Sequence, residues 1–161
     1  MNVIDTGMGF ERLVRALQDK HSNYDTDVFQ PIIKEIGRLS GFEYGKDEKI
    51  DIAMRVIADH LRAAVLLITD GASPSNKEQG YVVRRLLRRS IRFAFDLGVE
   101  KDLCSQVVPE IIDIYRHDFP EVGENQEKTA QFMMREEKIS RETLRKGLRM
   151  LDKLSSDGLT G

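Results

Sequence analysis

The sequence is poor in cysteine, in long apolar runs and in net charge. Its single cysteine, Cys104, excludes an internal disulfide and suits the cytosol. One cysteine and three scattered histidines give no metal-ligand spacing. The longest apolar run, residues 63–68, is too short to span a bilayer, and no basic segment with a following apolar run marks a signal peptide. We expect a cytoplasmic protein with no membrane partner and no metal bound to this chain.

The chain also has little net charge, −2 over 161 residues. Such a chain has no strong overall attraction to nucleic acid, so any RNA binding has to arise from local segregation of charge. Its length fits one domain with a sizeable core, and its 40% hydrophobic and 32% charged content fits a soluble, helix-rich class.

Apolar residues recur at helical spacing along most of the chain. This spacing predicts helices over 9–18, 26–39, 50–69, 78–97, 101–115 and 121–154. Residues 50–69 are apolar nearly all the way round, which places them at the centre of the core. Gly123 and Gly147 weaken the last segment, so it is one helix or two. Only residues 3–5 read as a strand. The predicted fold is all-α, a bundle of about five to six helices with a short N-terminal strand remnant.

The first motif is Gly7-x-Gly9-x-x-Arg12 at the start of a helix. Glycines let the backbone approach a ligand closely, and the following helix presents unpaired N–H groups. An arginine one turn into that helix can hold a phosphate with two hydrogen bonds. From spacing alone, a glycine turn followed by a surface arginine explains the pattern as well.

The second feature is a run of five arginines without lysine, Arg84, Arg85, Arg88, Arg89 and Arg92. At 100° per residue, four of them share about a third of the helix surface, opposite an apolar face. A solvated face usually mixes charges, and arginine favours bidentate phosphate contacts. Pairing with acids of other helices, such as Glu136 and Glu137, is an equally weighted alternative.

A loop over residues 70–79 leads directly into the arginine helix. The amide of Asn76 can both donate and accept hydrogen bonds, so it can read a base edge while the helix holds phosphates. Capping of the helix by Ser75 or Asn76 is the simpler interpretation. Asp59, His60 and Arg62, which interrupt the apolar segment, are interpreted as internal hydrogen-bond and ion-pair partners.

Four segments in this order resemble the alanyl-tRNA synthetase family, a group of class II enzymes. They read DTGMGFERL, KHSNYDTD, RVIADHLRAA and DGASPSNKEQGYVVRRLLRRSIR, and cover much of residues 4–92. The later REEKISRETLRKGLRMLDKL fits the same family more loosely. The resemblance assigns residues 1–20 to the C-terminal end of the aminoacylation core, with its motif 3. It assigns residues 21–161 to the helical domain that recognises the tRNA acceptor stem.

The resemblance also implies roles for single residues. Arg12 binds the γ-phosphate of ATP, Gly7 and Gly9 line the adenylate pocket, and Asp5 holds the amino group of alanine. Asn76 contacts the G·U wobble pair of the acceptor stem of tRNA(Ala). The phosphate contacts of the stem fall to Arg84, Arg85, Arg88, Arg89 and Arg92.

The implied activity is alanine–tRNA ligation with ATP and Mg²⁺, and the implied partners are tRNA(Ala), ATP and alanine rather than DNA. Motifs 1 and 2, a zinc-binding editing region and a second base-reading acid fall outside these residues. We therefore expect a piece of a longer enzyme that is inactive alone, because catalysis needs the rest of the site held in place. The alternative is a non-catalytic helical protein-interaction module.

Overall fold

Helix α3, Glu48–Thr69, lies at the centre of the molecule and contacts helices α2, α4, α5, α6 and α7. It is apolar nearly all round, and residues such as Met54, Ile57, Leu61 and Val65 are fully buried. The computed structural model describes residues 7–75 and 78–157. The prediction of a central helix over 50–69 is confirmed.

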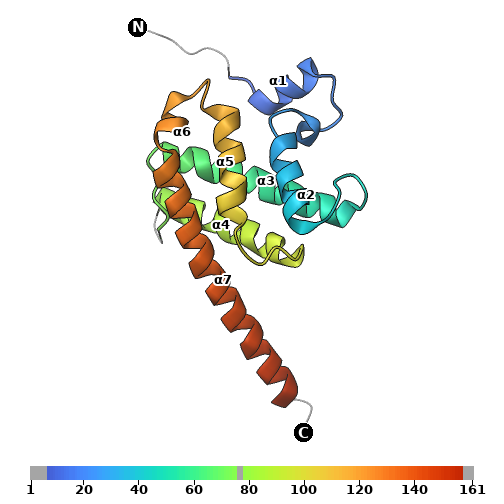
Figure 1. Ribbon diagram of the computed structural model, residues 1–161, viewed down its shortest axis with the longest axis vertical. Coiled ribbons are helices and arrows are strands. Elements are labelled where there is room, and N and C mark those ends of the chain that lie inside the picture. The colour runs from blue at the N-terminus through green and yellow to red at the C-terminus, as the bar shows by residue number, and fades with distance from the viewer. Residues whose placement is uncertain (1–6, 76–77, 158–161) are drawn as a thin grey trace.

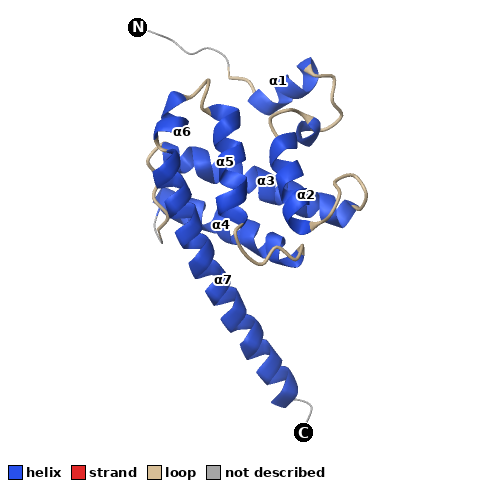
Figure 2. Ribbon diagram, viewed as in Figure 1, coloured by secondary structure: helices blue, strands red, loops and turns tan. Residues whose placement is uncertain are grey.

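The other helices surround α3 (Figures 1 and 2). They are α1 Phe10–Leu17, the 3₁₀ helix η1 Asn23–Asp25, α2 Gln30–Ser40, α4 Glu78–Asp96, α5 Leu103–Tyr115, α6 Pro120–Glu124 and α7 Gln126–Asp157. The described residues are thus all-helical, as predicted, with seven α-helices instead of five or six. The predicted strand over residues 3–5 lies outside the described residues.

Local signals set several of these boundaries. The Asp47 side chain accepts hydrogen bonds from the backbone N–H groups of Lys49 and Ile50 and so begins α3. Gly41, at φ 76°, ends α2 in the left-handed conformation that glycine adopts without strain. Helix α2 begins later than expected because η1 comes first and the Thr26 hydroxyl donates to the carbonyl of Asn23 at 2.6 Å.

The last predicted helix is two helices of unequal length, α6 and α7. Asn125 separates them, whereas Gly147 lies within α7 and does not interrupt it. The N-terminal half of α7 packs against the bundle through Met133 and buried polar residues. Its C-terminal half projects beyond the bundle (Figure 1), with Met150, Leu151 and Leu154 exposed.

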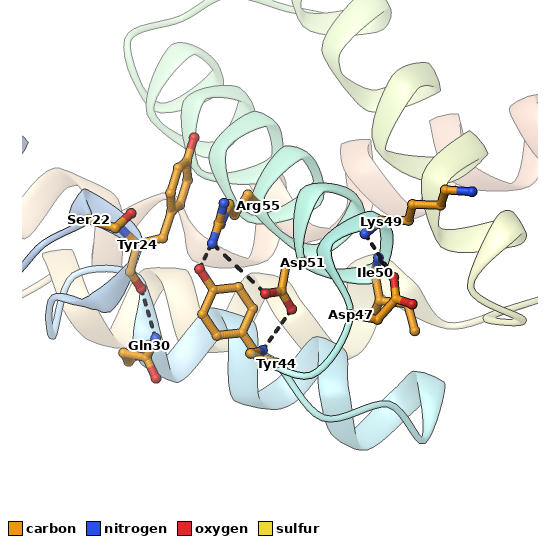
Figure 3. Close-up of polar contacts among 10 residues, drawn as sticks. Ser22, Tyr24, Gln30, Tyr44, Asp47, Lys49, Ile50, Asp51 and Arg55 are labelled. Atoms are coloured by element: carbon orange, nitrogen blue, oxygen red, sulfur yellow. Dashed lines mark hydrogen bonds and ion pairs between the residues drawn. The ribbon is translucent and has the colours of Figure 1, made fainter.

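A polar cluster closes the loop between α2 and α3 (Figure 3). Arg55 donates from Nε to the hydroxyl of Tyr44 at 2.6 Å, and its guanidinium lies 5.2 Å from the Tyr44 ring centroid and 5.6 Å from that of Tyr24. The carboxylate of Asp51 accepts from the backbone N–H of Gly45 at 2.7 Å. These contacts fix the loop against the N-terminal half of α3.

Candidate nucleic-acid interface

Helix α4 presents one face of arginines to solvent. Arg85, Arg88, Arg89 and Arg92 are exposed, whereas Val83, Leu87, Ile91 and Ala94 on the opposite side are buried in the core. Among the described residues, Arg85, Arg88 and Arg89 form no ion pair, and Arg89 lies 6.0 Å from the ring centroid of Phe93. These three guanidiniums share one helix face and have no acid partner among the described residues. They can therefore donate hydrogen bonds to an external anion.

Arg84, the first of the five arginines, is turned toward α7. Its Nε and Nη2 atoms donate to the two carboxylate oxygens of Glu136 at 2.8 and 2.9 Å. Glu136 is buried, and the Arg84 side chain is 18% exposed. The pairing alternative is thus confirmed for Arg84 with Glu136. Glu137, the other acid considered, pairs with Arg141 of its own helix instead.

The arginine face continues into a groove between α4 and α7. Arg92 pairs with Asp96 at 3.2 Å, and both side chains are about half exposed. A surface ion pair of this kind contributes little stability and can exchange for a phosphate. The groove has a volume of about 260 Å³ and is lined by Arg88, Ile91, Arg92, Ser140, Thr143 and Leu144.

The loop before α4 is held against the first turn of that helix. The backbone N–H of Ser75 donates to the carbonyl of Gly80 at 3.1 Å, and Ala72 is buried. A Cβ on Gly80 would lie 2.1 Å from the carbonyl oxygen of Ser73, so only glycine allows this approach. Asn76, the predicted base-reading residue, lies outside the described residues.

The N-terminal motif lies at the surface, with Gly7 and Gly9 before α1 and Arg12 in its first turn. Gly7, Gly9 and Arg12 are exposed, and Arg12 forms no ion pair within the part of the chain that the structure describes. Gly9 immediately precedes α1, and because glycine has no side chain, the first N–H groups of the helix have no side-chain cap. Asp5, the predicted alanine-binding residue, lies outside the described residues. Gly7, Gly9 and Arg12 lie on a different element from the arginine face.

Arg62 connects α1 to the core, which confirms its interpretation as internal scaffolding. It forms an ion pair with Glu11 of α1, donates from Nη1 to the hydroxyl of Tyr115 at 2.9 Å and lies 5.0 Å from the Phe29 ring centroid. Burial raises the pKa of Glu11, but hydrogen bonds from its own backbone N–H and from Arg62, with the charge of Arg62, outweigh burial, so the pKa is lowered overall.

A second buried ion pair escaped prediction from the sequence. Glu137 accepts from the backbone N–H groups of Leu103 and Cys104 at 3.1 and 2.8 Å, and from Nε of Arg141 at 2.8 Å. It thus caps α5, where the side chain of Asp102 makes no cap. The only sequence signal was the four-residue spacing of Glu137 and Arg141.

Burial and the nearby carboxylate raise the pKa of Cys104 well above its usual value, so it remains a neutral thiol.

Residues 7–75 and 78–157 offer neither a metal cluster nor a membrane-spanning helix. These residues contain no group of three or more histidine, cysteine or acidic side chains that could hold a metal ion. Within the same ranges, no helix has both the length and the apolar character that crossing a membrane requires.

Comparison with known proteins defines the class. The family described as tRNA synthetases class II (A) matches residues 1–159, so the chain belongs to this family. Its relatives include an alanine–tRNA ligase of Bacteroides fragilis, 51% identical over 156 residues that make up 96% of this chain and 18% of that protein. The alanine–tRNA ligase of Bacillus velezensis is 48% identical over 148 residues, 92% of this chain and 17% of that protein. The chain thus spans less than a fifth of the length of these relatives.

Proposed function

We propose that this chain is the acceptor-stem-binding part of an alanine–tRNA ligase, with the end of the aminoacylation core at residues 1–20 and the helical domain at 21–161. The observation that supports this most strongly is the row of exposed arginines on α4, in a chain that belongs to the tRNA synthetase family. Arg85, Arg88, Arg89 and Arg92 hold backbone phosphates of the stem, whereas Arg84 joins α4 to α7 through Glu136.

The loop before α4 reads the stem. The minor groove of an A-form duplex is wide and shallow, so a short polar side chain reaches base edges there. A G·U wobble pair displaces the exocyclic amine of guanine in that groove, and the amide of Asn76 senses the displacement. Phosphate contacts thus position the duplex and the amide selects it.

The N-terminal motif holds part of the ATP and alanine site. Gly7 and Gly9 leave room for the nucleotide, Arg12 binds the γ-phosphate, and Asp5 holds the amino group of alanine. The exposure of Arg12, and its lack of an ion pair with any described residue, fit this assignment. ATP with Mg²⁺ supplies the activated phosphoanhydride. A zinc-binding editing region belongs to other parts of the longer protein. The 161-residue chain alone has no alanine-dependent pyrophosphate exchange in this proposal.

The test is the salt dependence of binding to an RNA hairpin that carries the acceptor stem. Each contact to a phosphate releases counterions from the RNA. Removing one contact therefore makes the slope of log K against log salt less steep, by about the amount that one phosphate contributes. We expect Arg88→Ala and Arg89→Ala to weaken binding to every stem and reduce the slope. Arg135→Ala, which removes an exposed arginine of α7, should leave it unchanged. An unchanged slope for both α4 variants would contradict the proposal and favour a protein-interaction module.

Wobble reading is tested separately with Asn76→Ala in the longer enzyme. Loss of a hydrogen-bond partner at a buried contact costs about 1–3 kcal/mol. The variant should therefore lose preference for G·U over G·C stems in aminoacylation, while alanine activation stays unchanged. Equal losses on both stems would show that Asn76 positions the loop and does not read the base pair.

A further inference from the structure

Tyr81, in the first turn of α4, is an exposed aromatic residue that does not contribute to the packing of the fold. Its side chain is 52% exposed, and its hydroxyl has no hydrogen-bond partner among the described residues. Its ring makes no aromatic or cation–π contact with them either. A tyrosine held in this way presents an apolar ring and a hydroxyl that can both donate and accept.

Helix geometry places Tyr81 on the arginine face. Tyr81, Arg85 and Arg88 are spaced by four and three residues, so the three side chains follow one another along the same side of α4. Arg85 lies about 6 Å and Arg88 about 10 Å further along the helix axis. Val82, also exposed, lies 100° around the helix from Tyr81.

Tyr81 also lies beside the point where the preceding loop returns to the helix. Ser75 donates to the carbonyl of Gly80, the residue before Tyr81, so the loop end and the tyrosine share one turn of α4. Along this surface the order is therefore loop end, Tyr81, then the arginine row. Across the edge of an RNA minor groove the order is base edge, ribose 2′-hydroxyl, then phosphate.

We propose that Tyr81 hydrogen-bonds to a ribose 2′-hydroxyl between the base pair read by the loop and the phosphates held by the arginines. The inference rests on the proposed function, because it needs the stem to lie along α4. It assigns the choice of RNA over DNA to a particular residue. Guanidiniums recognise phosphates that both nucleic acids share, whereas the 2′-hydroxyl is the group that distinguishes them.

The test combines Tyr81→Phe with single 2′-deoxy substitutions in the acceptor-stem hairpin, which retain the rest of the RNA duplex. The 161-residue chain is titrated with the unmodified hairpin and with hairpins deoxy-substituted at each ribose near the wobble pair. For the wild type, one or two positions should weaken binding by roughly 3- to 10-fold, the effect of one hydrogen bond. Tyr81→Phe should bind the unmodified hairpin as weakly as the wild type binds the deoxy-substituted one. Deoxy substitution at those positions should not weaken the binding of Tyr81→Phe any further.

Controls separate the possible failures. Val82→Ala should keep the wild-type pattern, and Tyr81→Phe should keep the wild-type salt slope because no charge is removed. If Tyr81→Phe retains the sensitivity to deoxy substitution, or if the wild type has none, the inference is overturned while stem binding still supports the proposed function. If the wild type does not bind the hairpin at all, the proposed function fails and the inference fails with it.

Discussion

Each arginine of this chain acquires its role from the groups that face it. Arg62 and Arg84 each face a glutamate from another helix, Glu11 and Glu136, and join helices together. Arg85 and Arg88 face no acid within the described ranges and remain available to a ligand. Sequence spacing predicted which arginines share a helix face, but it could not assign Arg84, because its partner lies 52 positions away along the chain.

A prediction at this scale concerns the acid stability of the contact between α1 and α3. Because the folded state lowers the pKa of Glu11, the ionised carboxylate stabilises the fold at pH values above the ordinary glutamate pKa of 4.5. This contribution should be lost as the pH falls through the lowered value. Urea unfolding between pH 7 and 3 measures it.

The Glu11→Gln variant provides the comparison for that experiment. It should lose about 1 kcal/mol at pH 7, as expected for a partly exposed pair, and its stability should fall less steeply below pH 4.5 than that of the wild type. Asp59 and Glu35, whose pKa values are also lowered, stay ionisable in both proteins. Parallel pH profiles would contradict the assignment of this contribution to Glu11.

At the scale of the helices, boundaries with a local cause were predictable and boundaries with a distant cause were not. Asp47 and Gly41 mark helix ends by their own chemistry, and α3 and α4 lie within two residues of their expected limits. The cap of α5 comes from Glu137 on α7, 33 residues from Cys104. The late start of α2 was not predicted either, although its hydrogen bond from Thr26 to Asn23 spans only three residues. Propensity within a window does not record contacts of this kind.

Gly80 provides the prediction for this scale. In Gly80→Ala, the new Cβ would meet the carbonyl oxygen of Ser73 at 2.1 Å and the Ser75 hydroxyl at 2.3 Å, so the loop has to shift away from α4. We expect a loss of about 1–3 kcal/mol in unfolding free energy. We also expect a loss of preference for G·U stems, with the salt slope of stem binding retained.

Gly147→Ala is the matched control for that variant. Gly147 lies inside α7, and a Cβ there meets nothing within 4 Å. Replacing a glycine within a helix by alanine should stabilise the protein by roughly 0.5–1 kcal/mol. Calorimetric unfolding of both variants checks the opposite signs. A Gly80→Ala protein with unchanged stability and wobble preference would show that the loop does not depend on this approach.

At the scale of the whole molecule, the fold class could be predicted because the apolar spacing is helical throughout. The central position of α3 followed from its nearly continuous apolar surface. The extent of the bundle could not be predicted, because Ile139 and Leu151 are large apolar residues of α7 and are nevertheless exposed. Ile139 faces outward from a turn of α7 whose neighbours Glu137 and Ser140 are buried, whereas Leu151 lies beyond Leu148, the last half-buried residue of the helix.

A truncation tests this view of the molecule. Every described side chain from Arg149 to Leu154 is exposed, so ending the chain after Leu148 removes little buried surface. The shortened protein should unfold cooperatively with a free energy within about 1 kcal/mol of the full chain. Thermal unfolding followed by circular dichroism measures this. A large drop in Tm would mean that the projecting half of α7 stabilises the bundle.

The projection of α7 has a mechanical consequence. From Leu148, its last half-buried residue, to Asp157, helix α7 extends about 14 Å, so a tilt of about 5° at its base displaces the tip by roughly 1 Å. Glu136 and Glu137 hold the N-terminal half of α7 in place, because their partners lie on α4 and at the start of α5. A tilt of α4 that carried the base of α7 with it would therefore displace the far end of α7 more than the base.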